Sequence, residues 1–250
     1  MKAVLVGDTH GDATFVANVN RFARDNEATT VVQLGDFGYN FDRNLLASIG
    51  AFLDRDEENR WYWLDGNHDH HDYIEQVILK DQPLDSPVAH FHDRMFYCPR
   101  GSTTTLGDTK VMFLGGAFSI DKAYRKAHVS WWPQEMIRLQ DMNNALSNKK
   151  DVTVMFTHDS PPNDVLQELL DAYGYKVDAA SQENRDALAA VVSVVHPTHL
   201  YHGHYHHRYE SAYHDASGWM THVHGVAANY IQNRHEPRAL DDVNVLVREF

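Results

Sequence analysis

Residues 2–11 read Lys2-Ala3-Val4-Leu5-Val6-Gly7-Asp8-Thr9-His10-Gly11, and no other stretch says more about the fold. A short apolar run that stops at a glycine predicts a buried strand, and strands of parallel sheets have this pattern. Asp12 follows as a candidate helix cap, with apolar residues at helical spacing from Phe15 to Ala23. The stretch therefore predicts a strand, a polar loop and a helix, which together form the first unit of an α/β fold.

The same order of strand, polar loop and helix recurs along the chain. Strands are expected at Thr29–Leu34 and Trp61–Leu64, and the middle reads as short strands with hairpin turns at Arg100-Gly101 and Gly107-Asp108. No linker rich in Pro, Gly or Ser interrupts residues 1–250, so a single domain is predicted. The remaining expected elements are helices at 45–53, 73–79, 133–146, Asn163–Ala172 and Gln182–Val195, and strands at Met95–Pro99, Thr103–Leu106, Lys110–Leu114, Val152–Phe156, His199–His202, Glu210–His214, Trp219–Val223 and Val243–Arg248.

Composition excludes several classes of protein. The 250 residues carry a formal net charge of −13, which argues against a general nucleic-acid coat or a basic membrane-surface protein. Hydrophobic residues make up 43% of the chain, which is enough for a sizeable core. The lone Cys98 excludes a disulfide framework and a Cys-rich zinc site. No leader and no long apolar run is evident, so a cytoplasmic protein without a membrane partner is expected.

At five places a predicted strand ends in a short polar string that contains Asp, Asn or His. The loops at the carboxyl ends of strands are where ligands bind in α/β sheets, so these side chains are expected along one rim. The strings are Gly7-Asp8-Thr9-His10-Gly11, Gly35-Asp36-Phe37-Gly38, Gly66-Asn67-His68-Asp69, Thr157-His158-Asp159 and Gly203-His204-Tyr205-His206.

The donor types in these strings suit divalent metals. Carboxylate oxygen, amide oxygen and imidazole nitrogen are ligands for Mn, Fe, Zn, Ni or Co. In an extended backbone, residues two apart such as Asp8 and His10 point to the same side, and His204 and His206 share this spacing. Two metals about 3.5–4 Å apart clamp an in-line displacement at phosphorus and activate water as the nucleophile. The candidate ligands are Asp8, His10, Asp36, Asn67, His158, His204 and His206.

The five strings, in this order, resemble those of the calcineurin-like metallophosphoesterase superfamily. The resemblance implies that Asp8, His10 and His206 hold one metal and that Asn67, His158 and His204 hold the other. Asp36 would bridge the two metals, a hydroxide held between the metals would attack phosphorus, and His68 would assist the leaving group, so Asp36 and His68 are the expected catalytic residues. The implied fold is a four-layer αββα sandwich of two mixed β-sheets flanked by helices.

The middle of the chain resembles a little-characterised bacterial and phage branch of the superfamily, a resemblance that does not name a substrate. It is carried by Gly115-Gly116-Ala117-Phe118-Ser119-Ile120-Asp121-Lys122 and Ser130-Trp131-Trp132-Pro133-Gln134-Glu135. Protein phosphatases of the superfamily follow the bridging Asp with Val-Asp-Arg-Gly, whereas Asp36 is followed by Phe37-Gly38-Tyr39-Asn40. This difference disfavours protein phosphatase activity. Asp69 then either orients His68 or caps the following helix.

Several residues have two readings. Arg100 and Arg125 are candidate substrate residues because arginine binds phosphate oxygens in pairs, but each can instead form a salt bridge with an acid such as Asp121 or Glu135. Trp131 and Trp132 either stack on a nucleobase or pack in the core. The leucines at 166, 169 and 170 either pack internally or form a homodimer interface. His70, His71, His202, His207, His222 and His224 are expected in the core or on the surface rather than as ligands.

The function predicted from these observations is a phosphodiesterase that uses two divalent metals, with Mn as the expected metal. Small or cyclic nucleotides are the expected substrates, because no Arg cluster or cap domain that would suit a dianionic monoester is evident. The charge of −13 disfavours long nucleic acid as a partner. The alternatives are a phosphomonoesterase that acts on nucleotides or proteins, a nuclease that acts on DNA or RNA ends, and a non-catalytic scaffold on the same fold.

Overall fold

The computed structural model describes residues 1–38, 43–55, 59–229 and 245–250. Within these ranges the strands form two mixed sheets of six strands each. Tyr39, Asn40 and the start of the strand expected at Val243 lie outside the described residues. No helix in the described ranges has the length and apolar character needed to cross a bilayer.

The first sheet has the strand order β12-β1-β2-β3-β5-β4. Its four inner strands run parallel, and antiparallel strands close both edges. Parallel inner strands place their carboxyl ends at one edge of the sheet, where the polar strings follow them. The strands are β1 (Lys2–Val6), β2 (Thr30–Gln33), β3 (Arg60–Trp63), β4 (Val88–His90), β5 (His92–Tyr97) and β12 (Val245–Glu249).

The second sheet repeats this plan with the order β10-β11-β9-β8-β7-β6. Its inner strands are again parallel and its edge strands antiparallel. The hairpin expected at Gly107-Asp108 joins β6 to β7 and is confirmed. The strands are β6 (Thr103–Leu106), β7 (Thr109–Leu114), β8 (Val154–Thr157), β9 (His199–His202), β10 (Tyr209–His214) and β11 (Met220–Gly225).

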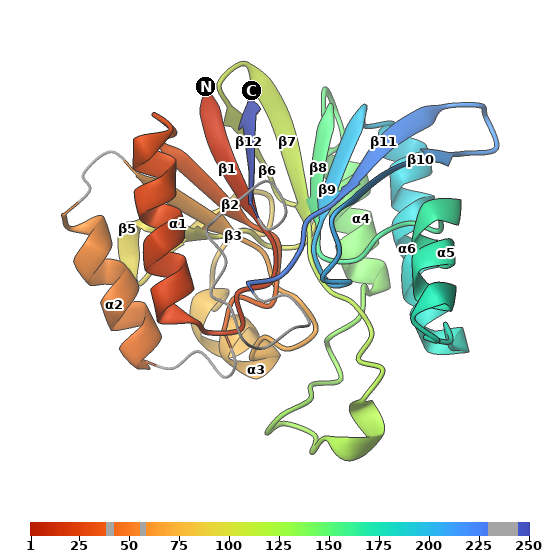
Figure 1. Ribbon diagram of the computed structural model, residues 1–250, viewed down its shortest axis with the longest axis horizontal. Helices are drawn as coiled ribbons and strands as arrows, with labels where there is room; N and C mark the ends of the chain where they lie inside the picture. The colour runs from red at the N-terminus through yellow and green to blue at the C-terminus, as the bar shows by residue number, and fades with distance from the viewer. Residues whose placement is uncertain (39–42, 56–58, 230–244) are drawn as a thin grey trace.

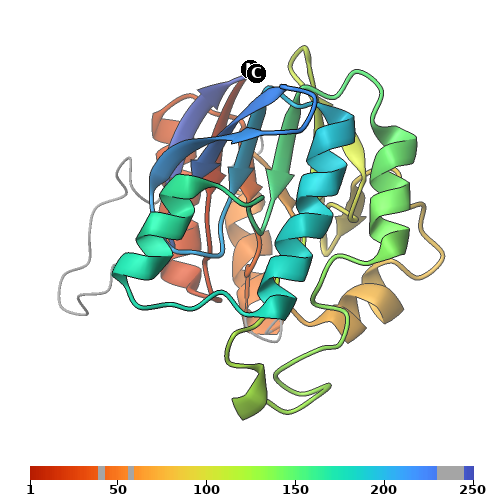
Figure 2. The same ribbon diagram turned by 90° about the vertical axis from the view of Figure 1, so that its right-hand side faces the viewer.

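Helices cover the outer face of each sheet, which gives the four layers expected from the sequence (Figures 1 and 2). Apolar residues of β1 show why both faces of a sheet are buried, because successive side chains point to opposite sides. Val4 and Val6 pack in the core under the helices, whereas Leu5 packs between the two sheets. The helices are α1 (Ala13–Asp25), α2 (Arg43–Leu53), α3 (His71–Tyr73) and the π-helical turn η2 (Ile74–Ile78) on one side, and α4 (Leu139–Asn148), α5 (Asp164–Ala172) and α6 (Ala179–Val195) on the other.

The expected hairpin at Arg100-Gly101 is wrong. This turn instead carries the chain from β5 in the first sheet to β6 in the second. Gly101 has a φ of 81°, and a Cβ there would lie 2.4 Å from the backbone nitrogen of Ala145, so the crossing needs a glycine. Arg100 is thereby placed in the junction between the sheets.

The segment between β7 and α4 extends away from the sandwich and carries only the short helix η3 (Lys122–Tyr124) (Figures 1 and 2). The helix expected to follow Trp131-Trp132-Pro133 begins only at Leu139. Asp141 accepts a hydrogen bond from the Arg138 backbone nitrogen at 2.9 Å, which caps the helix start. The turns before Leu139 leave residues 115–135 as an arm that reaches the carboxyl edge of the sheets.

Candidate metal centre

The five polar strings meet where the carboxyl ends of β1, β2, β3, β8 and β9 come together, between the two sheets (Figure 1). Asp8 and His10 follow β1, and His206 follows β9. Donor atoms of these three residues all lie within 4.8 Å of one another. The closest contact joins His206 Nε2 to Asp8 Oδ2 at 3.1 Å. This group could hold one divalent cation.

A second group of donors combines Asp8, Asp36 and His158. His158 Nε2 lies 3.6 Å from Asp36 Oδ1 and 3.0 Å from Asn67 Oδ1. The other ring nitrogen of His158, Nδ1, donates to the Leu34 carbonyl at 2.7 Å, which directs Nε2 towards the carboxylates. The structure therefore brings an imidazole from the second sheet to the acids of the first.

Asp36 lies at the centre of the cluster, with a side chain only 2% exposed. Its Oδ2 is 3.7 Å from His10 Nε2 and 3.9 Å from His68 Nε2. A central carboxylate with imidazoles around it and an amide oxygen nearby is a donor set that divalent transition metals accept. The residues present therefore fit a pair of metals.

His204 lies beside His158 with the two ring centroids 5.0 Å apart, whereas the His206 ring lies 5.0 Å from that of His10. The two histidines therefore face different halves of the cluster. Their spacing in the sequence indicated one shared side, an expectation that holds only for extended backbone. His10, Asp36, His204 and His206 instead have positive φ values of 45°, 54°, 68° and 59°.

Left-handed backbone is uncommon outside glycine and costs about 1–3 kcal/mol per residue. Four of the seven candidate ligands adopt it, which indicates that the surrounding fold holds the donors in place against local preference. Short polar residues such as Asp and His tolerate this conformation best. The strain could not be recognised from the sequence, because only the tertiary packing selects it.

The pKa values of the carboxyls show why this cluster favours cations. Burial raises the pKa of Asp8, but the charge and hydrogen bond of His206 outweigh burial and lower it to about 2. The pKa of Asp36 is held well below its usual value by His68 and His158 despite burial. Burial acts against protonation of His158, yet Asp36 raises its pKa to about 10. The carboxylates are thus ionised at neutral pH, as metal ligands must be.

Asn67 is oriented by two residues of the arm. Its Nδ2 donates to Ser119 Oγ at 3.0 Å, and Ser119 Oγ donates to Glu135 Oε2 at 2.6 Å. Since the amide nitrogen is bound to Ser119, the amide oxygen is directed to His158 and the cluster. The two strings that resemble the bacterial and phage branch therefore reach the centre through Ser119 and Glu135, which sequence reasoning did not identify.

In two of the strings the glycine makes room for the carboxylate of a candidate ligand from another string. A Cβ on Gly66 would lie 2.1 Å from Asp36 Oδ1 and 2.4 Å from the Asp36 backbone nitrogen. A Cβ on Gly203 would lie 2.4 Å from Asp8 Oδ1. No neighbour can yield by such a distance without moving a candidate ligand.

We expect Gly66→Ala to lower phosphoester hydrolysis by about 100-fold, because a displacement of about 1 Å in a reacting group can cost this much. Bound metal, measured by plasma emission spectroscopy, should fall as well. Gly50→Ala is the matched control. Gly50 lies inside α2, and among the described residues a Cβ there would meet Phe91 at 3.6 Å, an ordinary van der Waals contact. Unchanged metal content and activity in Gly66→Ala would contradict the assignment of Asp36 to the centre.

His68 lies beside the donor groups rather than within them. Its backbone nitrogen donates to Asp36 Oδ1 at 2.8 Å, and its Nε2 is 3.3 Å from Arg125 Nη2. Burial lowers the pKa of His68, Asp36 opposes this effect, and the charge of Arg125 adds to it. The imidazole therefore faces the cavity at the rim of the centre, where it can contact a bound phosphoester.

The contacts of the Asp69 side chain match neither of its two expected roles, which were to orient His68 or to cap the following helix. Its buried carboxylate accepts hydrogen bonds from the backbone nitrogens of Gly66 at 2.8 Å and Gly38 at 3.2 Å. The helical turn that follows is capped by His70 instead, which accepts from the Tyr73 nitrogen. Asp69 thus ties the loop of Asp36 to the loop of Asn67.

The two arginines that were candidate substrate residues lie in different places. Arg125 lines the cavity above the centre and forms a bidentate ion pair with Asp121, with both contacts at 2.7 Å. Arg100 is buried in the junction between the sheets, where it binds Asp65 at 2.6 Å and Asp141 at 3.1 Å. These acids and three backbone carbonyls occupy its guanidinium, and Arg100 is not among the residues that line the cavity.

Neither tryptophan of the arm lines the cavity. Trp132 is buried, with its ring 4.8 Å from that of His70, and Lys122 lies 4.2 Å above the ring of Trp131. His202 is also a buried packing residue that contacts the Tyr209 hydroxyl at 2.6 Å. Trp132 therefore packs in the core, as one of its two readings expected, and His202 is buried as expected.

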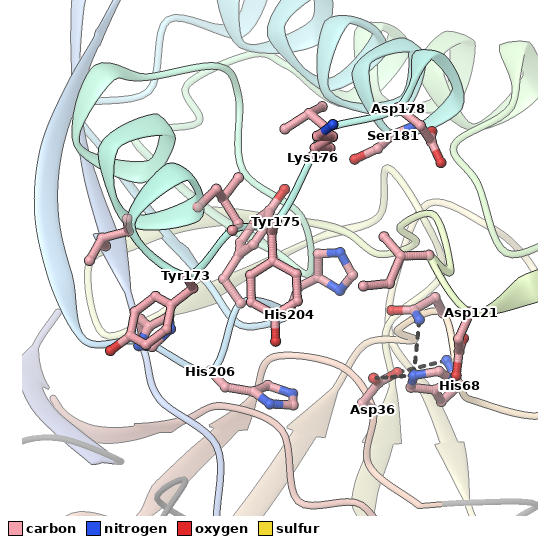
Figure 3. A pocket seen from close by; sticks show the side chains of 18 of the residues that line it. Asp36, His68, Asp121, Tyr173, Tyr175, Lys176, Asp178, Ser181, His204 and His206 are labelled. Carbon is pink, nitrogen blue, oxygen red and sulfur yellow. Dashed lines mark hydrogen bonds and ion pairs between the residues drawn. The ribbon is translucent and has the colours of Figure 1, made fainter.

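A cavity of about 570 Å³ lies over the centre. The arm forms one wall with Ile120, Asp121 and Arg125, and the end of α5 with the following loop forms the other, with Leu169, Leu170 and residues 173–178 (Figure 3). Leu166 packs in the core and Leu169 and Leu170 pack against the same cluster, as the internal-packing reading expected, and both also line the cavity. The string Tyr173-Gly174-Tyr175-Lys176 between two predicted helices was the available signal for this wall.

Two mixed sheets with Asp, His and Asn donors at their shared carboxyl edge define a metallophosphoesterase architecture. The family model for calcineurin-like phosphoesterase matches residues 1–208, so the chain belongs to the calcineurin-like phosphoesterase family. This family uses a dinuclear metal centre, and the candidate ligand groups lie where such a centre is needed. The superfamily expected from the five strings is confirmed.

Solved structures share the fold at low sequence identity. TT1561 of Thermus thermophilus is 12% identical with a TM-score of 0.52, covering 91% of this chain and 89% of its own. A dimetal phosphatase from Danio rerio is 13% identical with a TM-score of 0.51, covering 91% and 87%. GAP50, described as the anchor in the inner membrane complex of Plasmodium, is 10% identical with a TM-score of 0.50, covering 98% and 76%. No curated protein matches the sequence.

Proposed function

We propose that the chain hydrolyses phosphodiesters of small or cyclic nucleotides with two divalent metals, Mn²⁺ being the expected ion, and that residues 1–250 act as one domain. Asp36 is the proposed bridging ligand. Two groups of donors, Asp8 with His10 and His206 and Asp8 with Asp36 and His158, support the proposal of two metals. The contacts of Asp36 with His10 and His158, at 3.7 and 3.6 Å, support its bridging role. One metal would be held by Asp8, His10 and His206, and the other by Asn67, His158 and His204.

Bound metals at these donors would supply Lewis acidity and lower the pKa of water. The side chains of the cavity supply positioning. Arg125, held in a fixed orientation by Asp121, can bind a non-bridging phosphate oxygen. His68, next to Arg125, can donate a proton or a hydrogen bond to the leaving-group oxygen.

The balance of charges on the cavity walls is the observation that supports a preference for diesters. Arg125 and Lys176 are the lysine and arginine side chains among the described lining residues, and Asp121 and Asp178 line the same walls. The walls outside the donor set therefore add no net positive charge. A phosphodiester carries one negative charge, whereas a monoester carries up to two, so these walls suit the diester better.

With Mn²⁺ we expect kcat/KM for bis-p-nitrophenyl phosphate to exceed that for p-nitrophenyl phosphate by about ten-fold, which corresponds to about 1.4 kcal/mol of transition-state binding. The release of p-nitrophenolate measures both rates under the same conditions. A preference of the same size for the monoester would overturn the proposal in favour of a phosphomonoesterase.

A non-catalytic role is the second candidate, because GAP50 shares the fold and is described as an anchor. This role predicts neither tight metal binding nor turnover. About two equivalents of Mn²⁺ per chain, together with metal-dependent hydrolysis, would exclude it. A nuclease role predicts that DNA or RNA, single-stranded or duplex, is degraded from its ends under the same conditions.

A further inference from the structure

The loop that connects α5 to α6 forms one wall of the cavity, and local hydrogen bonds fix its conformation. α5 ends in a turn in which the Tyr175 nitrogen donates to the Leu170 carbonyl at 2.9 Å and the Gly174 nitrogen to the Asp171 carbonyl at 3.0 Å. Gly174 has a φ of 73°, as this type of helix end requires. Asp178 then caps α6 by accepting from the Ser181 nitrogen at 2.8 Å. Both ends of the loop are therefore fixed by local hydrogen bonds.

Two aromatic side chains of this loop line the cavity although neither is buried. Tyr173 is 51% exposed and Tyr175 is 46% exposed. Tyr173 stacks on His207 with ring centroids 4.6 Å apart and planes 20° apart. In the view of Figure 3, Tyr175 lies between Tyr173 and the candidate catalytic residues Asp36 and His68. A phosphate group does not stack on an aromatic ring. A half-exposed ring beside a candidate phosphate site therefore offers a stacking surface to another part of the ligand.

The end of the cavity opposite Asp36 and His68 in Figure 3 is polar, and it carries Lys176, Asp178 and Ser181. An ammonium, a carboxylate and a hydroxyl together offer hydrogen-bond donors and acceptors. A heterocycle with polar edges suits this combination better than a plain phenyl ring. The volume of about 570 Å³ also exceeds what a phosphate needs and falls within the range of small-molecule sites.

We propose that the α5–α6 loop binds the base of a nucleoside phosphate, with Tyr175 as the stacking residue and the polar end of the cavity at the base edge. This inference rests on the proposed function, because the phosphate of the same ligand must occupy the candidate metal centre. It makes Tyr175 a specificity-determining residue, since its ring contributes to binding of the base and not to the phosphoryl chemistry.

The test compares the binding of AMP and ribose 5-phosphate to the whole Mn²⁺-loaded chain by titration calorimetry. The two ligands share the phosphate and the sugar and differ by the base. We expect AMP to bind about ten-fold more tightly, the size of effect that stacking of one base gives. Tyr175→Ala should remove this difference and leave the Kd of ribose 5-phosphate unchanged, whereas Tyr175→Phe should keep it.

Tyr124→Ala is the matched control, because Tyr124 is 94% exposed and does not line the cavity. Equal affinities for AMP and ribose 5-phosphate in the unmodified protein would overturn the inference and leave the proposed function standing. A preference that survives Tyr175→Ala, or phenyl phosphate binding more tightly than AMP, would also overturn it. If neither sugar phosphate binds the Mn²⁺-loaded protein, the inference fails, whereas the proposed function is decided separately by metal-dependent hydrolysis of bis-p-nitrophenyl phosphate.

Discussion

Replacing Asp36 with Asn should reduce phosphodiester hydrolysis by about 10³-fold, comparable to the loss of a main electrostatic contact to a transition state. Asn has nearly the same shape, so the change removes the charge and leaves the packing. The charge matters because the buried carboxylate lies 3.6 Å from His158 Nε2 in its own donor group and 3.7 Å from His10 Nε2 of the other donor group. Without it, a pair of cations at this place would repel each other with less compensation.

The same variant should bind less than two equivalents of Mn²⁺, which metal analysis after gel filtration measures. Asp72→Asn is the control, since Asp72 contacts His128 and Gln134 and lies outside the cavity. The circular dichroism of both metal-free variants shows whether either has lost its fold. An Asp36→Asn protein with full metal content and full turnover would rule out the proposed bridging role.

Replacing His68 with Asn should slow hydrolysis by about 10²–10⁴-fold when the leaving group is an alcohol, the range that general acid catalysis contributes. The loss should be much smaller for bis-p-nitrophenyl phosphate, because p-nitrophenolate leaves without a proton. Metal content should not change, since His68 belongs to neither donor group. Comparison of a dinucleotide substrate with the chromogenic diester under Mn²⁺ separates these effects.

His128→Asn serves as the control, because the His128 side chain is 58% exposed and contacts only Asp72 among the ion pairs of the described residues. It should leave both rates unchanged. An equal loss on both leaving groups would assign His68 to holding the phosphate rather than to protonating the leaving group. Loss of metal in His68→Asn would instead place His68 among the ligands.

Most of the fold was predictable from the sequence because its signals are local. The run Val4-Leu5-Val6 followed by Gly and Asp predicts a strand buried on both faces, and the two core clusters on either side of β1 confirm this. Asp12 caps α1 by accepting from the Phe15 nitrogen at 2.9 Å, as expected. The turn at Arg100-Gly101 was wrong, because a local sequence does not show whether two successive strands share a sheet.

The candidate site was predictable in its donor types and less so in its geometry. The seven ligand candidates lie at one edge of the two sheets, and their metal-binding role stays a prediction. The two arginines were not distinguishable from the sequence, since both are cationic side chains in an acidic chain and each has candidate acidic partners. Burial separates them, because Arg100 is enclosed by Asp65 and Asp141 whereas Arg125 faces the cavity.

The sequence by itself determined which strands end in Asp, Asn and His, and therefore which donor types the chain offers to divalent metals. These are properties of residue type and of short-range periodicity. Only the tertiary structure decided which donors meet, because His158 and Leu34 are 124 residues apart and come together through the packing of two sheets. The left-handed backbone at His204 and His206 and the aromatic wall at Tyr175 likewise depend on that packing. Contacts between distant segments follow from how the sheets and helices fit together, which no local pattern encodes.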